Sequence, residues 1–169
     1  NNVSGNESVA FGFTNTISAA EAVAMGRNNQ VIATGGSAIG NNNQAMAMYS
    51  TAIGNDNYAI GENSSAIGLG NNITANDATA LGNKNTASGI SAGAVGISNT
   101  ASGHNAQAFF YLNEATAQDS QAFGAQNKAT ERYASAFGHE NEAKAYAGSA
   151  LGVKNVVTGD FGSAVGYDN

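Results

Sequence analysis

Side chains that can do acid–base or nucleophilic chemistry are few and isolated in this chain. The two histidines, His104 and His139, lie far apart and at non-equivalent positions of the repeat described below. A catalytic base has to lie within hydrogen-bond reach of the group that it deprotonates, and the sequence shows no such grouping. We interpret both histidines as solvated residues of a turn or an outer face, and we predict a protein that is not an enzyme.

Carboxylates are the second candidate chemistry, because their oxygens bind calcium. Asn55-Asp56-Asn57 and Glu62 come closest to a ligand set, but the Gly-Gly-x-Gly-x-Asp pattern of calcium-binding β-rolls is missing. A single acidic turn is usually only solvated. The 22 glycines also lack the Gly-x-x-x-x-Gly-Lys arrangement of phosphate loops. We therefore expect no metal site and no cofactor.

The composition excludes several classes of protein. The chain has 169 residues and a net charge of −6, so nucleic acid and anionic membranes are unsuitable partners. Alanine is the largest part of the 42% apolar fraction, and proline, cysteine and tryptophan are absent. Such a chain builds neither a helical bundle nor a thick core of large side chains. It lacks an apolar run of membrane-spanning length and begins without Met, so we expect a soluble segment of a longer protein.

A repeat of 14 residues runs through the whole chain without an insertion or a deletion, which indicates one solenoid turn per repeat. One position of the repeat, called the comb position here, is glycine in every turn but one, where it is Phe110. The comb glycines are Gly12, Gly26, Gly40, Gly54, Gly68, Gly82, Gly96, Gly124, Gly138, Gly152 and Gly166. An asparagine follows each comb position by three residues: Asn15, Asn29, Asn43, Asn57, Asn71, Asn85, Asn99, Asn113, Asn127, Asn141, Asn155 and Asn169.

The alternation around the glycine, taken as position 0, predicts a strand. Position −2 is always alanine, position −1 is always large and apolar, and position −4 is small. Positions +4 to +8 alternate between polar residues and apolar or small ones, with Glu131 as an exception, and predict a second strand. Fourteen residues suit two short strands and two tight turns. We predict an all-β parallel β-roll (β-solenoid) of about twelve turns, forming one repeat domain over residues 1–169.

The large residues at position −1 decide what lies inside the roll. If they pointed inward, the constant smallness of the alanine and glycine columns would have no explanation. We therefore expect the small residues to face inward and the large ones to form an external stripe, too large for a soluble monomer to leave exposed. We predict that this stripe is the interface of a homo-oligomer, formed by Phe11, Met25, Ile39, Ile53, Ile67, Leu81, Val95, Phe109, Phe123, Phe137, Leu151 and Val165.

The asparagine column has a structural explanation. Asparagine tolerates the left-handed backbone region and bonds its own backbone in turns, so it suits a corner between strands. Stacked corners would also align the side chains as an amide ladder. We assign this column no binding role.

Several motifs in this chain resemble the head repeats of trimeric autotransporter adhesins of the YadA-like type: Ser8-Val9-Ala10-Phe11-Gly12, Ser65-Ala66-Ile67-Gly68, Thr86-Ala87-Ser88-Gly89, Ser149-Ala150-Leu151-Gly152 and Ser163-Ala164-Val165-Gly166. The resemblance implies a left-handed roll, a homotrimer, and a place on a stalk at the surface of a Gram-negative bacterium. The outer-membrane anchor would lie in segments beyond this sequence. The corner asparagine, where the family often has serine, and Phe110 differ from the family pattern.

Two groups of large residues on otherwise polar faces are candidate partner-binding sites. One lies in turn eight, the repeat whose glycine position is occupied by Phe110, and comprises Phe110, Tyr111 and Leu112. The alternative explanation of this group is a bulge that repacks the roll or the subunit interface. The other comprises Ile32, Met46 and Ile60 at position +6, with Met48 and Tyr58 on neighbouring columns. Cross-strand stacking is the favoured explanation of the +6 residues.

These observations predict an adhesin head that binds a host extracellular-matrix or cell-surface protein and presents each site three times. An ice-binding or purely structural solenoid is the alternative. Ice binding would need an uninterrupted threonine array, which Ile32, Met46 and Ile60 break.

Overall fold

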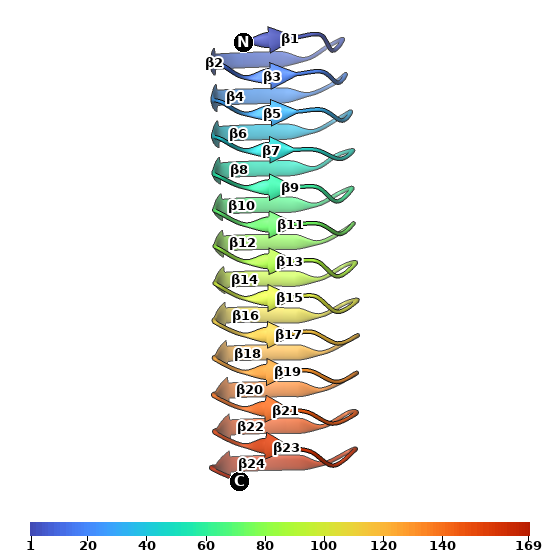
Figure 1. Ribbon diagram of the computed structural model, residues 1–169, viewed down its shortest axis with the longest axis vertical. Helices are drawn as coiled ribbons and strands as arrows, with labels where there is room; N and C mark the ends of the chain where they lie inside the picture. Colours follow the sequence, from blue (N-terminus) through green and yellow to red (C-terminus); the bar gives the residue numbers. More distant parts are fainter. The chain divides into compact units, whose positions relative to one another are not determined.

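The computed structural model describes residues 1–169, which form two units, Asn1–Lys84 and Asn85–Asn169. Each unit is a parallel β-solenoid without helices, in which five-residue strands alternate with two-residue strands along the chain (Figure 1). The predicted all-β parallel roll is thereby confirmed. The structure contains no helix of the length and apolarity that a membrane crossing requires.

In unit Asn1–Lys84 the long strands form one sheet and the short strands form another. The long strands are β2 (Val9–Phe13), β4 (Val23–Arg27), β6 (Ser37–Asn41), β8 (Thr51–Asn55), β10 (Ser65–Leu69) and β12 (Thr79–Asn83). The short strands are β1 (Asn2–Val3), β3 (Thr16–Ile17), β5 (Gln30–Val31), β7 (Gln44–Ala45), β9 (Tyr58–Ala59) and β11 (Asn72–Ile73).

Unit Asn85–Asn169 repeats this arrangement. Its long strands are β14 (Gly93–Ile97), β16 (Gln107–Tyr111), β18 (Gln121–Ala125), β20 (Ser135–His139), β22 (Ser149–Val153) and β24 (Ser163–Tyr167). Its short strands are β13 (Thr86–Ala87), β15 (Thr100–Ala101), β17 (Glu114–Ala115), β19 (Lys128–Ala129), β21 (Glu142–Ala143) and β23 (Val156–Val157).

Small side chains fill the interior of both units, as the sequence predicts. Ala52 and Ala66 at position −2 are fully buried, and so is Ala59 at position +5. Only a few larger apolar side chains, such as Ile17 and Ile73, are fully buried. The alternative roll, with the large position −1 residues inside, is therefore wrong.

The comb glycines allow consecutive turns to approach closely. Gly54 has a φ of +119°, a conformation that L side chains rarely adopt. A Cβ atom at Gly54 would overlap the carbonyl oxygen of Gly68 in the next turn. Glycine is therefore required at this position both for its backbone conformation and for lack of space.

The asparagine column forms the expected amide ladder. The Nδ2 of Asn57 donates to Oδ1 of Asn43 at 3.0 Å, to the carbonyl oxygen of Ile53 at 3.0 Å and to that of Gly68 at 2.8 Å. The backbone N–H of Asn57 also donates to Oδ1 of Asn43, at 3.2 Å. Because these carboxamides are fully buried, their hydrogen bonds satisfy polar groups that would otherwise be costly to bury.

The left-handed conformation, in contrast, does not fall on this column. It falls on the residue before each buried asparagine, for example Asn42 with a φ of 57° and Asp56 with a φ of 55°. The column asparagines therefore lie at the predicted corner, but their tolerance of left-handed geometry is not what places them there. The asparagine side chains are buried at the corner, and the left-handed residue before each of them changes the direction of the chain.

Turn eight keeps the regular register although Phe110 replaces the glycine. In β16, Phe110 pairs with Gly96 on one side and with Gly124 on the other, so the ladder contains no bulge. Its φ is 91°, which is unusual for a residue with a side chain. The turn therefore retains its fold with a locally strained backbone.

We predict that Gly54→Ala lowers the free energy of unfolding by more than about 2 kcal/mol, because strained φ and steric overlap add. Gly70→Asn is the matched control, since Gly70 has a φ of +65° and its added Cβ would meet nothing closer than Cγ of Lys84 at 3.5 Å. Chemical denaturation of both variants measures the difference. Equal stability of the two variants would contradict the close-approach explanation.

Candidate functional site

The large residues at position −1 lie on the outside of each unit. In unit Asn1–Lys84, Ile39 pairs with Ile53, and Ile53 with Ile67, so their side chains share one face of the long-strand sheet. These three are half-buried by their neighbours along the column, whereas Phe11 is 71% exposed and Leu81 is 44% exposed. The face is thus a band of apolar side chains that no other part of the unit covers.

Unit Asn85–Asn169 carries a corresponding band with aromatic residues in it. The ring centroids of Phe109 and Phe123 lie 4.8 Å apart in an edge-to-face arrangement, and those of Phe123 and Phe137 lie 5.0 Å apart and stacked. Val165 is 66% exposed. The rings pack along the solenoid but leave their outer surface to solvent.

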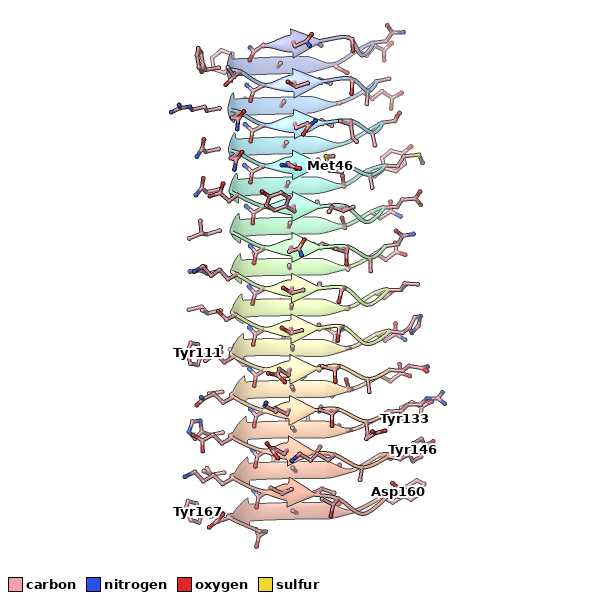
Figure 2. All side chains as sticks on the ribbon, viewed as in Figure 1. Met46, Tyr111, Tyr133, Tyr146, Asp160 and Tyr167 are labelled. Carbon is pink, nitrogen blue, oxygen red and sulfur yellow. The ribbon has the colours of Figure 1, made fainter.

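Turn eight exposes three consecutive large residues. Phe110 is 67% exposed, Tyr111 is 48% exposed and Leu112 is 39% exposed. Tyr111 ends β16 and projects outward from the corner that follows the strand (Figure 2). The register of β16 is unbroken, and these three consecutive exposed residues lie at the corner where the strand ends.

The second group of predicted site residues lies in unit Asn1–Lys84. Ile32, Met46 and Ile60 follow the short strands β5, β7 and β9, so they occupy equivalent positions in consecutive turns. Figure 2 labels Met46 at the end of its short strand. Ile32 and Ile60 are exposed, and Met46 is half-buried. Met48 is exposed and Tyr58 is half-buried on adjacent columns. The equivalent positions in adjacent turns are compatible with stacking between turns and with a partner site.

The residues considered for acid–base chemistry and metal binding are dispersed. His104 is exposed, and the exposed His139 lies 3.2 Å from the carboxylate of its half-buried neighbour Glu140. The carboxylate of Asp56 accepts hydrogen bonds from Asn42 and Asn55. No three histidine, cysteine, aspartate or glutamate side chains gather at a metal-binding distance.

An aromatic cluster that the sequence analysis missed lies at the other corner of unit Asn85–Asn169. The ring centroids of Tyr133 and Tyr146 lie 5.7 Å apart, and those of Tyr146 and Phe161 lie 5.4 Å apart, both edge to face. Arg132 stacks on Tyr133, and Asp160 accepts a hydrogen bond from the backbone N–H of Tyr146. Figure 2 shows Tyr133, Tyr146 and Asp160 projecting from this corner. Comparing positions +8 and +9 between turns would have revealed the cluster.

Comparison with known proteins assigns the chain to a family. The model of the YadA head domain repeat, which spans two copies of the repeat, matches residues 32–57, 47–71, 74–96, 115–141 and 143–169. No curated protein matches the sequence. The family matches cover well over half of the chain and fall on the turns whose glycine, asparagine and alanine columns are described above. The chain therefore belongs to the family of YadA head domain repeats.

Proposed function

We propose that this chain is the head of a trimeric adhesin at the bacterial cell surface and that it binds a host protein without catalysing a reaction. The observation that supports the proposal best is the apolar band outside the roll, together with membership in the YadA head family. The host partner is an extracellular-matrix or cell-surface protein, and the outer-membrane anchor belongs to another segment of the protein.

The band at position −1 is the proposed homotrimer interface. Ordering the backbone costs about 1–2 kcal/mol per residue, and a core of alanine and glycine offsets little of that cost. Each large apolar side chain contributes about 1.5–3 kcal/mol when fully buried. Ile53 and Ile67 are half-buried and Leu81 is exposed in the single chain. Part of their stabilising free energy of burial is therefore gained only when another chain covers them. Folding and assembly are then coupled.

The turn-eight cluster is the proposed partner site. Exposed aromatic and aliphatic side chains are the usual anchors of protein interfaces, and Phe110, Tyr111 and Leu112 are all exposed. The strained φ of Phe110 supports this assignment, because strain at an exposed residue persists at a cost in stability that a binding role would explain. Three copies in one assembly would multiply the strength of adhesion to a dense ligand.

We predict that Ile53→Asp combined with Ile67→Asp dissociates and unfolds the assembly together, because six carboxylates would be buried without partners in a trimer. Sedimentation analysis and circular dichroism measure the two effects. Asn72→Asp combined with Thr74→Asp is the charge-matched control at exposed positions of the same unit and should retain the assembly. A well-folded monomer carrying the isoleucine substitutions would refute the proposed interface.

We predict that Tyr111→Ser combined with Leu112→Ser abolishes adhesion to host cells while changing stability by only about 0.5 kcal/mol, because both side chains are exposed. Cell-adhesion assays and thermal melting measure the two effects. A large loss of melting temperature would instead assign these residues to packing.

Phe110→Gly tests the same site with a variant that should be more stable than the unsubstituted protein. Glycine restores the residue of the other turns, so it should relieve strain worth about 1–3 kcal/mol and raise the melting temperature. Adhesion should fall because the exposed ring is lost. Full adhesion in this variant would remove Phe110 from the proposed partner site.

A further inference from the structure

A polar hollow lies at the corner that follows the long strands β2 to β8 in unit Asn1–Lys84. Its volume is about 590 Å³. Two adjacent columns of the repeat line it: position +1 contributes Phe13, Arg27 and Asn41, and position +2 contributes Asn28, Asn42 and Asp56. None of these residues belongs to the proposed trimer interface or to the proposed partner sites, so the hollow is a separate feature.

One side of the hollow is a row of hydrogen-bonded side-chain amides. Asn28 donates to Oδ1 of Asn42 at 2.8 Å, and Asn42 donates to the carboxylate of Asp56. Asn41 donates to Oδ1 of Asn55 at 2.8 Å, and Asn55 donates to Asp56 at 3.0 Å. These bonds fix the orientation of the amides, while Oδ1 of Asn28 and of Asn41 accept no hydrogen bond from the protein. The row therefore presents oriented donors and acceptors to a ligand.

The other end of the hollow is cationic and aromatic. Phe13 and Arg27 occupy paired positions of β2 and β4, so their side chains emerge from neighbouring turns. Both are exposed, and Arg27 takes part in none of the ion pairs of the chain. The carboxylate in the hollow, that of Asp56, lies two turns away from Arg27 and accepts hydrogen bonds from Asn42 and Asn55. The guanidinium thus remains available for a carboxylate brought by a ligand.

We propose that this hollow binds a saccharide that carries a carboxylate, such as a hexuronic acid. The ligand carboxylate would pair with the fork of Arg27, and the apolar C–H face of the sugar ring would lie against Phe13. Sugar hydroxyls both donate and accept hydrogen bonds, and so do the carboxamides of Asn28, Asn41 and Asn42. A neutral sugar would leave the guanidinium unpaired, and a simple anion would leave the amide row unused.

The test titrates the assembled protein with methyl β-glucuronide, with methyl β-glucoside and with inorganic phosphate, using ligand-observed NMR and calorimetry. We expect the glucuronide to bind at least about tenfold more tightly than the other two, because only it uses both ends of the hollow. Arg27→Gln should make the affinities for glucuronide and glucoside equal. Arg132→Gln is the matched control, since Arg132 lies in the other unit against Tyr133, and it should leave the tenfold preference intact.

Three outcomes would overturn the proposal. One is the absence of glucuronide binding at millimolar concentration, and another is equal affinity for glucuronide and glucoside in the unsubstituted protein. The third is phosphate binding as tight as glucuronide binding, which would reduce the hollow to a contact between Arg27 and any anion. Thermal melting of Arg27→Gln checks that the exposed substitution leaves the fold intact.

Discussion

The close approach of consecutive turns at the glycine and asparagine columns is the constraint on which the rest of the structure depends. The carbonyl oxygen of Gly68 accepts a hydrogen bond from the side chain of Asn57 and lies where a Cβ on Gly54 would have to be. This contact holds the roll thin at one corner, so alanines such as Ala52 and Ala66 make up most of the interior, and only a few larger side chains such as Ile73 fit inside. The large apolar side chains at position −1 consequently lie outside, where only another surface can cover them.

Much of this architecture is predictable from the sequence because the same residue pattern recurs in every turn. An exception in one turn therefore does not obscure the assignment of strands and faces. Alanine at position −2 and a large residue at position −1 in every turn give the strand, its faces and its register. The amide ladder also follows, since a stacked column of asparagines has few other ways to satisfy its side chains. The burial of Ala24 and the exposure of Phe11 confirm the assignment of faces.

The errors and omissions have physical causes as well. Asparagine's tolerance of left-handed geometry explains a corner position in general, yet here the left-handed residue is the preceding one, whatever its type, as at Leu112 and Lys154. The hollow beside Arg27 and the cluster around Tyr146 combine columns in which residue types vary from turn to turn. The cluster becomes visible in the sequence only when positions +8 and +9 are compared between neighbouring turns, and the hollow only when positions +1 and +2 are compared in the same way. Examining one column at a time shows neither.

Turn eight shows how the constraint can be broken without loss of the fold. Phe110 stands in the glycine column with its strained φ, yet Asn113 still donates to the carbonyl oxygens of Phe109 and Gly124, both at 2.6 Å. The neighbouring turns hold the register through their own hydrogen bonds, so the strain stays local. A long regular ladder thus tolerates an irregular residue, and such a residue can serve recognition.

We infer that a core of small residues leaves the stability of the chain dependent on contacts between chains. The most direct test is the melting temperature measured over a roughly hundredfold range of protein concentration, because coupled assembly makes it concentration-dependent. We expect the melting temperature to rise with protein concentration and the oligomer to be lost at the same temperature as the β-structure. A melting temperature independent of concentration, with folded single chains persisting after dissociation, would contradict it.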